Sequence, residues 1–112
     1  MQSPTHDESQ RYRVDETVWG DLTGFKRDLL RVLAELDSPN GLELEAELQS
    51  LYPDLTHARV YQNLDQLADD GLITKQSVTD RENAYTLASS GEAHLQAAAD
   101  RLTDALQDGE QP

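Results

Sequence analysis

The sequence contains no cysteine among its 112 residues. This absence excludes a disulfide framework, a zinc site with cysteine ligands, a cysteine nucleophile and redox sensing through thiols. Aromatic residues make up only 5% of the chain. No apolar run approaches the roughly 18 residues that a membrane-spanning helix needs, and the start MQSPTHDESQ is too polar for a secretory signal. We therefore expect a cytoplasmic chain with one modest core.

Basic residues are also scarce. Nine Lys and Arg stand against 22 Asp and Glu, a formal net charge of −13, and the only lysines are Lys26 and Lys75. Taken alone, this charge argues against a nucleic-acid partner, because affinity for DNA depends on neutralised phosphates. The alternative is adaptation to a very salty cytoplasm, since at about 1 M salt the Debye length falls to roughly 3 Å. Abundant acids with little lysine favour this halophilic interpretation.

The usual signatures of a catalytic or metal site are missing as well. His6, His57 and His94 are isolated from one another in the sequence. There is no glycine-rich phosphate loop and no G-x-S-x-G motif. We expect no enzymatic activity, no cofactor and no bound metal.

The hydrophobic pattern predicts a mainly α-helical fold with a small β hairpin. Residues 1–10 are polar and are expected to form a disordered tail, followed by the main domain over residues 11–88. A first helix begins after Thr23, a plausible N-cap, and stops around Asp37, at the breaker of residues 38–41. Its apolar positions recur at helical spacing and are Phe25, Leu29, Leu30, Val32, Leu33 and Leu36.

Two further helices are expected with a short connection between them. The second runs from about Leu42 to Leu51, and the third begins after the N-cap Thr56 and ends at Gly71. Their apolar stripes are Leu44, Leu48 and Leu51 in the second helix and Val60, Leu64 and Leu67 in the third. Together they form a helix-turn-helix unit.

The amino-acid composition changes after the third helix, from a helical to a strand-like pattern. Residues 72–79 have the composition of a strand, residues 80–83 that of a turn, and residues 84–87 that of a returning strand. This hairpin is the wing of a winged helix-turn-helix. A last helix is expected over residues 89–109, added at the C-terminal side of the domain.

The third helix carries the candidate DNA-reading surface. If its stripe faces the core, the opposite side presents four polar residues and no acid: Arg59, Gln62, Asn63 and Gln66. In the major groove arginine can pair with guanine, and asparagine or glutamine with adenine. Further candidates are Thr56 and His57, for a phosphate at the helix start, and Lys75 and Arg81 on the wing. An ordinary solvated surface is the alternative for these residues.

The last helix has a narrow apolar stripe of Leu95, Ala98, Leu102 and Leu106. A solitary helix has to bury such a stripe, and a twin helix from a second subunit is the simplest partner. Packing onto its own domain is the alternative. Trp19 and Leu22 are further candidates for the dimer interface. A twofold dimer would place two reading helices about one DNA turn (~34 Å) apart, on a palindromic operator.

Three segments resemble the PadR-like winged-helix regulators, especially the small versions of halophilic archaea. They are LTGFKRDLLRVLAELDSPNGLELEAELQ, RVYQNLDQLADDGLITK and NAYTLASSGEAHL, and they cover about residues 22–95. The resemblance implies a dimer that represses or activates genes through a recognition helix, a wing and a C-terminal dimer helix. It extends to the member named for its response to reactive oxygen species. Without cysteine, any oxidant sensing here cannot be a thiol switch.

We therefore expect a sequence-specific DNA-binding transcription regulator, a homodimer adapted to high salt, with salt cations at the DNA interface. The chain departs from the family pattern at Gln62, where proline is frequent, and in its short C-terminal region. The alternative function is an acidic winged-helix module that binds proteins or mimics DNA. A mimic should line its active face with carboxylates, and the Arg59–Gln66 face has none.

Overall fold

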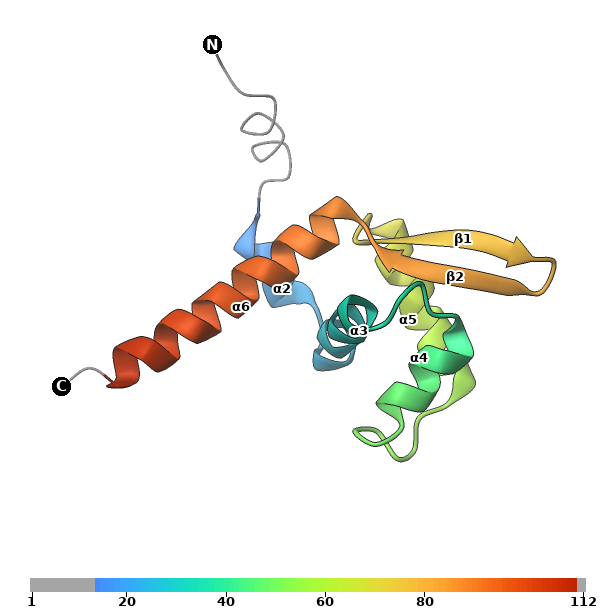
Figure 1. Ribbon diagram of the computed structural model, residues 1–112, viewed down its shortest axis with the longest axis horizontal. Coiled ribbons are helices and arrows are strands. Elements are labelled where there is room, and N and C mark those ends of the chain that lie inside the picture. The colour runs from blue at the N-terminus through green and yellow to red at the C-terminus, as the bar shows by residue number, and fades with distance from the viewer. Residues whose placement is uncertain (1–13, 111–112) are drawn as a thin grey trace, which may run out of the picture.

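The computed structural model describes residues 14–110, so the predicted tail at residues 1–10 lies outside the described part. Five helices and one antiparallel hairpin follow in chain order: α2 (Glu16–Asp21), α3 (Gly24–Glu35), α4 (Gly41–Leu48), α5 (His57–Asp69), β1 (Ile73–Thr79), β2 (Glu82–Leu87) and α6 (Ser89–Glu110). Figure 1 shows α3, α4 and α5 grouped together, with the hairpin projecting to one side and α6 to the other. The predicted mainly α-helical fold with a small hairpin is confirmed. No helix in residues 14–110 is long and apolar enough to cross a membrane.

The helix starts follow from side-chain caps. The Thr23 hydroxyl accepts a hydrogen bond from the Lys26 amide, and the Thr56 hydroxyl accepts one from the Arg59 amide, both at 3.2 Å. Each bond satisfies an amide that has no partner inside its own helix, so both predicted N-caps are confirmed. A third cap, at the start of α4, was not predicted from the sequence. It is a capping box in which the Asn40 side chain accepts a hydrogen bond from the Glu43 amide and the Glu43 side chain accepts one from the Asn40 amide.

The C-terminal end of α5 depends on Gly71, which has a φ of +78°. The Gly71 amide donates to the Ala68 carbonyl and the Leu72 amide to the Leu67 carbonyl, each at 3.0 Å. This bond pair is a Schellman motif, and its left-handed residue is nearly always glycine. The predicted role of Gly71 is confirmed, and the motif directs the chain from α5 straight into β1.

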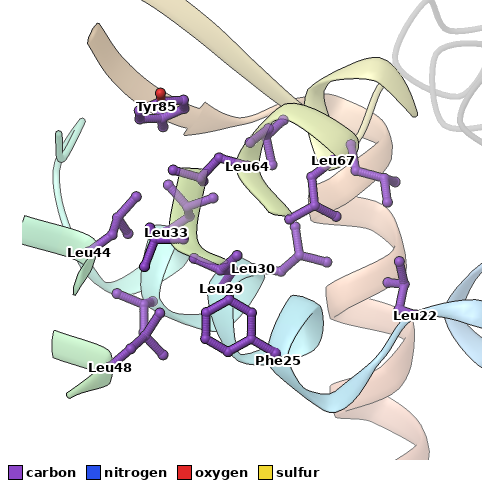
Figure 2. Packing of buried hydrophobic residues seen from close by; sticks show 14 of the residues in the cluster. Leu22, Phe25, Leu29, Leu30, Leu33, Leu44, Leu48, Leu64, Leu67 and Tyr85 are labelled. Carbon is purple, nitrogen blue, oxygen red and sulfur yellow. The ribbon is translucent and has the colours of Figure 1, made fainter. Parts of the chain in front are cut away.

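The core lies between α3, α4, α5 and the base of the hairpin. Figure 2 shows leucines of the three helices pointing toward one another, with the Tyr85 ring of β2 above them. The predicted stripe of α5 is fully buried, as are Leu44 and Leu48 of α4. In α3, five of the six predicted positions are buried, and Leu36 is partly buried. Burying such side chains contributes about 1.5–3 kcal/mol each, which makes this cluster the main source of stability.

The predicted extent of the second helix is wrong at its C-terminal end. Helix α4 ends at Leu48, and Leu51 is 55% exposed instead of completing the stripe. The amides of Leu51 and Tyr52 both bond to the Leu48 carbonyl, so the chain tightens into a turn there and the helical spacing is lost. Leu55, only 8% exposed, belongs to the core cluster instead.

The hairpin is longer and tighter than predicted. The second strand begins at Glu82, so only Asp80 and Arg81 connect the two strands. Between Ser77 and Thr79 the register shifts, which leaves Val78 as an extra residue in β1. The Tyr85 amide donates to the Pro39 carbonyl at 2.9 Å. This bond ties the wing to the connection between α3 and α4 and fixes its direction.

Helix α6 divides into two halves. Near its start Gly91, His94 and Ala98 are buried, and Leu95 packs against the core. The imidazole Nδ1 of His94 donates to the Ser90 carbonyl at 2.7 Å, and its Nε2 accepts from the Asp15 amide at 3.3 Å. Because Asp15 caps α2, this histidine joins α6 to α2. The C-terminal half of α6 extends beyond the rest of the domain (Figure 1).

Candidate nucleic-acid interface

The outward side of α5 follows from how its inward side packs. Gln62 lies midway between the buried residues Val60 and Leu64, and at 3.6 residues per turn it therefore points away from the core. Ala58 precedes it by one turn and Gln66 follows it by one turn, and all three are exposed. From His57 to Leu64 the helix contains no acid, and Asp65 is the first.

The four polar residues predicted to share one face divide into two pairs. Gln62 and Gln66 project outward, as expected. Arg59 and Asn63 lie on the flank that faces α3. The Arg59 guanidinium carbon is 4.2 Å from the centroid of the Phe25 ring, and the half-buried Asn63 side chain donates to the Arg59 carbonyl at 2.7 Å. The helix repeat alone does not separate these pairs, since positions 59 and 66 differ by only about 20° around the helix axis. The contact of Arg59 with Phe25 and the bond of Asn63 to the Arg59 carbonyl distinguish them.

Two of the predicted phosphate-binding side chains already contact acids. His57 Nδ1 is 2.6 Å from Glu45 Oε1 of α4, and Lys75 Nζ on β1 is 3.5 Å from Asp65 Oδ1. Both basic side chains remain largely exposed and stand beside α5. The Thr56 hydroxyl is engaged as acceptor by the Arg59 amide, which leaves its own proton free to donate.

Arg81 lies in the exposed two-residue turn at the tip of the wing. Next to it, the Asn40 side chain donates to a Glu82 carboxylate oxygen at 2.7 Å, a bond from the start of α4 to the wing. A hollow of about 330 Å³ lies between these two elements, and Tyr61 of α5 lines it too. The hydrogen bond and the shared hollow therefore connect the wing tip to α4 and α5.

Sequence reasoning missed two aromatic side chains of this region. Tyr61 packs against the His57 ring at a centroid distance of 4.8 Å, and any side chain at Gly41 would overlap it. Tyr52 lies beside Arg59, and its hydroxyl donates to Asp28 at 2.6 Å. That hydrogen bond, and burial after it, raise the pKa of the Tyr52 hydroxyl above its ordinary value. The RVYQ segment quoted for the family resemblance contained Tyr61, but no local pattern linked Tyr52 to a residue in α5.

The arrangement of two short helices, an exposed third helix and a hairpin agrees with the comparisons with known proteins. The model of the transcriptional regulator PadR-like family matches residues 29–97, more than half of the chain. The chain belongs to this family. The resemblance seen in the sequence is thereby confirmed, and its PadR-like relatives are transcription regulators rather than enzymes.

Several solved structures are similar to this chain. RosR of H. salinarum, in a structure grown from NaBr, is 33% identical over 82% of this chain and 81% of that chain, with a TM-score of 0.69. A complex structure of the same RosR is 35% identical over 79% of this chain and 76% of that chain, with a TM-score of 0.67. A mutant of ZitR from Lactococcus lactis covers 80% of this chain and 59% of its own at 18% identity and a TM-score of 0.61, which shows the fold alone. No curated protein matches the chain.

The histidines and acids of the described residues were also considered as metal ligands. Within residues 14–110, no group of three or more His, Asp or Glu side chains is placed to hold a metal ion. The buried His94 uses both ring nitrogens in hydrogen bonds to the backbone. Its role in this PadR-like chain is therefore to join helices, which the sequence could not distinguish from an isolated surface histidine.

Proposed function

We propose that the chain is a sequence-specific DNA-binding regulator of transcription that acts as a homodimer on palindromic operators at high salt. The observation that carries the proposal is the acid-free, exposed N-terminal half of α5 beside the wing. In a chain with 22 acids, an exposed surface without any carboxylate is a place where a phosphate backbone can approach without direct repulsion.

The outward side of α5 suits base reading in the major groove. A glutamine side chain can form two hydrogen bonds to adenine, and the methyl group of an alanine can contact the methyl group of thymine. Gln62 and Gln66, with Ala58 one turn earlier, present these groups from one side of the helix. Thr56, His57, Lys75 and Arg81 surround this side and are proposed to meet phosphates at its edges.

The exposed half of α6 supports a homodimer. Leu102 is 67% exposed and Leu106 is 71% exposed, one turn apart on the same side of the helix. A hollow of about 370 Å³ next to Leu102 is lined by Trp19 and Arg27 as well. Leu22 and Ala98, also predicted at the interface, are buried within the single chain, and Ala98 lines the same hollow. Leu95 is partly buried in the same way.

The net charge also favours the alternative of an acidic module that binds basic proteins. A mimic of DNA would present carboxylates along its binding surface, but the proposed reading surface has none before Asp65. The acids of this chain lie around that surface instead. We therefore propose that salt cations sit between neighbouring carboxylates and phosphates in the complex, which a chain of this charge needs at the rim of the interface.

The proposal is tested by replacing Gln62, whose side chain makes no hydrogen bond within residues 14–107. The operator is first selected from a random duplex library at about 1 M KCl, where screening is strong. We expect Gln62→Ala to weaken operator binding by at least about 10-fold, because each of the two half-sites loses one base contact worth about 1–3 kcal/mol. Gln107→Ala, the same change at an exposed position of α6, is expected to bind like the wild type. No selected sequence, or equal affinity for both variants, would contradict the proposal.

A further inference from the structure

Arg59 is held by aromatic rings from two other parts of the fold. Its guanidinium carbon is 4.2 Å from the centroid of Phe25, in the first turn of α3, and 5.1 Å from that of Tyr52, in the connection between α4 and α5. The two rings contact each other edge to face, with centroids 5.0 Å apart. This contact makes a corner of two rings against which the guanidinium rests.

The corner is itself fixed. Phe25 is buried, and the Tyr52 hydroxyl is anchored to the Asp28 carboxylate at 2.6 Å. The backbone of Arg59 is bound on both sides, because its amide donates to Thr56 and its carbonyl accepts from Asn63. Both ends of the Arg59 side chain, the backbone and the guanidinium, therefore have restrained positions.

The charge of Arg59 is still available to a ligand. Within residues 14–107, where side chains are described, no carboxylate lies within ion-pair distance of Arg59, whereas His57 and Lys75 each have one. A shallow hollow of about 200 Å³ opens beside it, lined by Tyr52 and Asp54 among others. An aromatic ring below the guanidinium plane leaves the N–H groups at its edge free to donate.

We propose that Arg59 binds a backbone phosphate at the edge of the major groove, and that Tyr52 and Phe25 are positioning residues which hold its guanidinium there. The inference rests on the proposed function and changes the assignment of Arg59 from a base reader to a phosphate clamp. The planar fork of a guanidinium fits two phosphate oxygens. Because Arg59 turns toward α3, away from the outward direction of Gln62, it meets the strand that borders the groove. Phosphate contacts of this kind position a protein on DNA without reading sequence.

The first test separates phosphate contact from base contact. Binding of Arg59→Ala is measured by fluorescence anisotropy on the selected operator and on a scrambled duplex of the same composition, at one fixed KCl concentration. We expect the affinity for both duplexes to fall by the same factor, at least about 10-fold, because each subunit loses one charge-assisted contact. Gln62→Ala serves as the matched control and is expected to weaken the operator alone.

Each other outcome has a definite meaning. A loss confined to the operator would make Arg59 a base reader and overturn the inference, and so would unchanged affinity for both duplexes. If the wild-type protein does not distinguish the two duplexes, the proposed sequence-specific function fails. The inference about Arg59 then still stands or falls on the fold-change measured with the scrambled duplex.

The second test addresses the aromatic corner. Tyr52→Phe keeps the ring and loses only the bond to Asp28, and we expect its affinity to stay within about 2-fold of the wild type because the ring contact remains. Tyr52→Leu removes the ring, and we expect both duplexes to bind about 3-fold to 5-fold more weakly although Arg59 is intact. Wild-type affinity of Tyr52→Leu would overturn the positioning role. If that variant does not fold, Arg59→Lys decides, since it keeps the charge without the planar fork and is expected to bind more weakly than the wild type.

Discussion

Gly91 and Gly24 are both helical glycines, yet they have opposite surroundings. A Cβ on Gly91 would collide with the Leu72 carbonyl oxygen, because the start of α6 lies directly against the connection between α5 and β1. A Cβ on Gly24 would meet nothing within 4 Å. Replacing each glycine by alanine therefore measures how much the close contact between the α6 backbone and Leu72 contributes to the free energy of unfolding.

We expect Gly91→Ala to lower the free energy of unfolding by about 1–3 kcal/mol, because α6 has to move away from Leu72. Gly24→Ala is expected to leave it unchanged or to raise it by up to about 1 kcal/mol, since alanine has the higher helix propensity. Chemical denaturation of both variants at one salt concentration measures the difference. If Gly91→Ala is as stable as Gly24→Ala, the close approach has no energetic importance.

At the residue scale, the sequence predicted what depends on neighbours within about one helical turn. The caps Thr23 and Thr56, the stripe of α5 and the glycine at its end were all correct, because each acts on backbone groups nearby. Arg59 lies on the predicted helix, but its contact with the Phe25 ring was not predicted. Its orientation depends on Phe25, which is 34 positions earlier, and no periodicity carries information over that distance.

The elements were predicted more reliably in kind than in extent. Helix α2 was missed because a short helix at the edge of the fold shows no clear apolar period, and its cap Asp15 depends in part on His94 of α6. The end of α4 was placed too late because Leu51 continues the sequence spacing although the backbone has already turned. The wing turn was placed too wide because Glu82 and Asn83 have turn composition but pair with β1.

Helix α6 leads to a prediction about assembly. We expect the double variant Leu102→Gln/Leu106→Gln to be a monomer at concentrations where the wild type is a dimer, because both leucines are exposed in the single chain and lose apolar area at the proposed interface. The folded monomer itself should lose little stability, so the fall in unfolding temperature is expected to equal the stabilisation that the dimer adds by mass action. Sedimentation velocity at high KCl measures the assembly state.

The matched control for this experiment is Leu42→Gln/Leu51→Gln. These leucines are 60% and 55% exposed and belong to the helix-turn-helix. The control is expected to remain a dimer. If it dissociates while the α6 variant does not, the partner binds elsewhere and the proposed role of α6 is wrong.

The whole molecule joins two properties that conflict in ordinary salt: a net charge of −13 and membership of a family of transcription regulators. The placement of charge reduces the conflict. The outward N-terminal half of α5 is free of acids, and the acids Glu45 and Asp65 at its edges are paired with His57 and Lys75. Long-range repulsion from the remaining acids is removed only by salt, so DNA binding by the proposed surface depends on a salty environment.

The last prediction therefore concerns salt. Ordinary DNA-binding proteins release cations from DNA and lose affinity steeply as salt rises, with a logarithmic slope of about −0.9 for each neutralised phosphate. In the proposed complex, cations are also taken up between carboxylates and phosphates, so we expect operator affinity to fall only slightly, or to rise, across KCl concentrations around and above about 1 M. Asp54→Asn/Asp65→Asn removes two carboxylates beside α5 and is expected to make the slope more negative.

The matched control for this prediction is Asp100→Asn/Asp104→Asn, which changes the net charge equally on α6 and should leave the slope as in the wild type. A steep wild-type decline, or equal slopes for the two double variants, would show that cations have no such place in the interface.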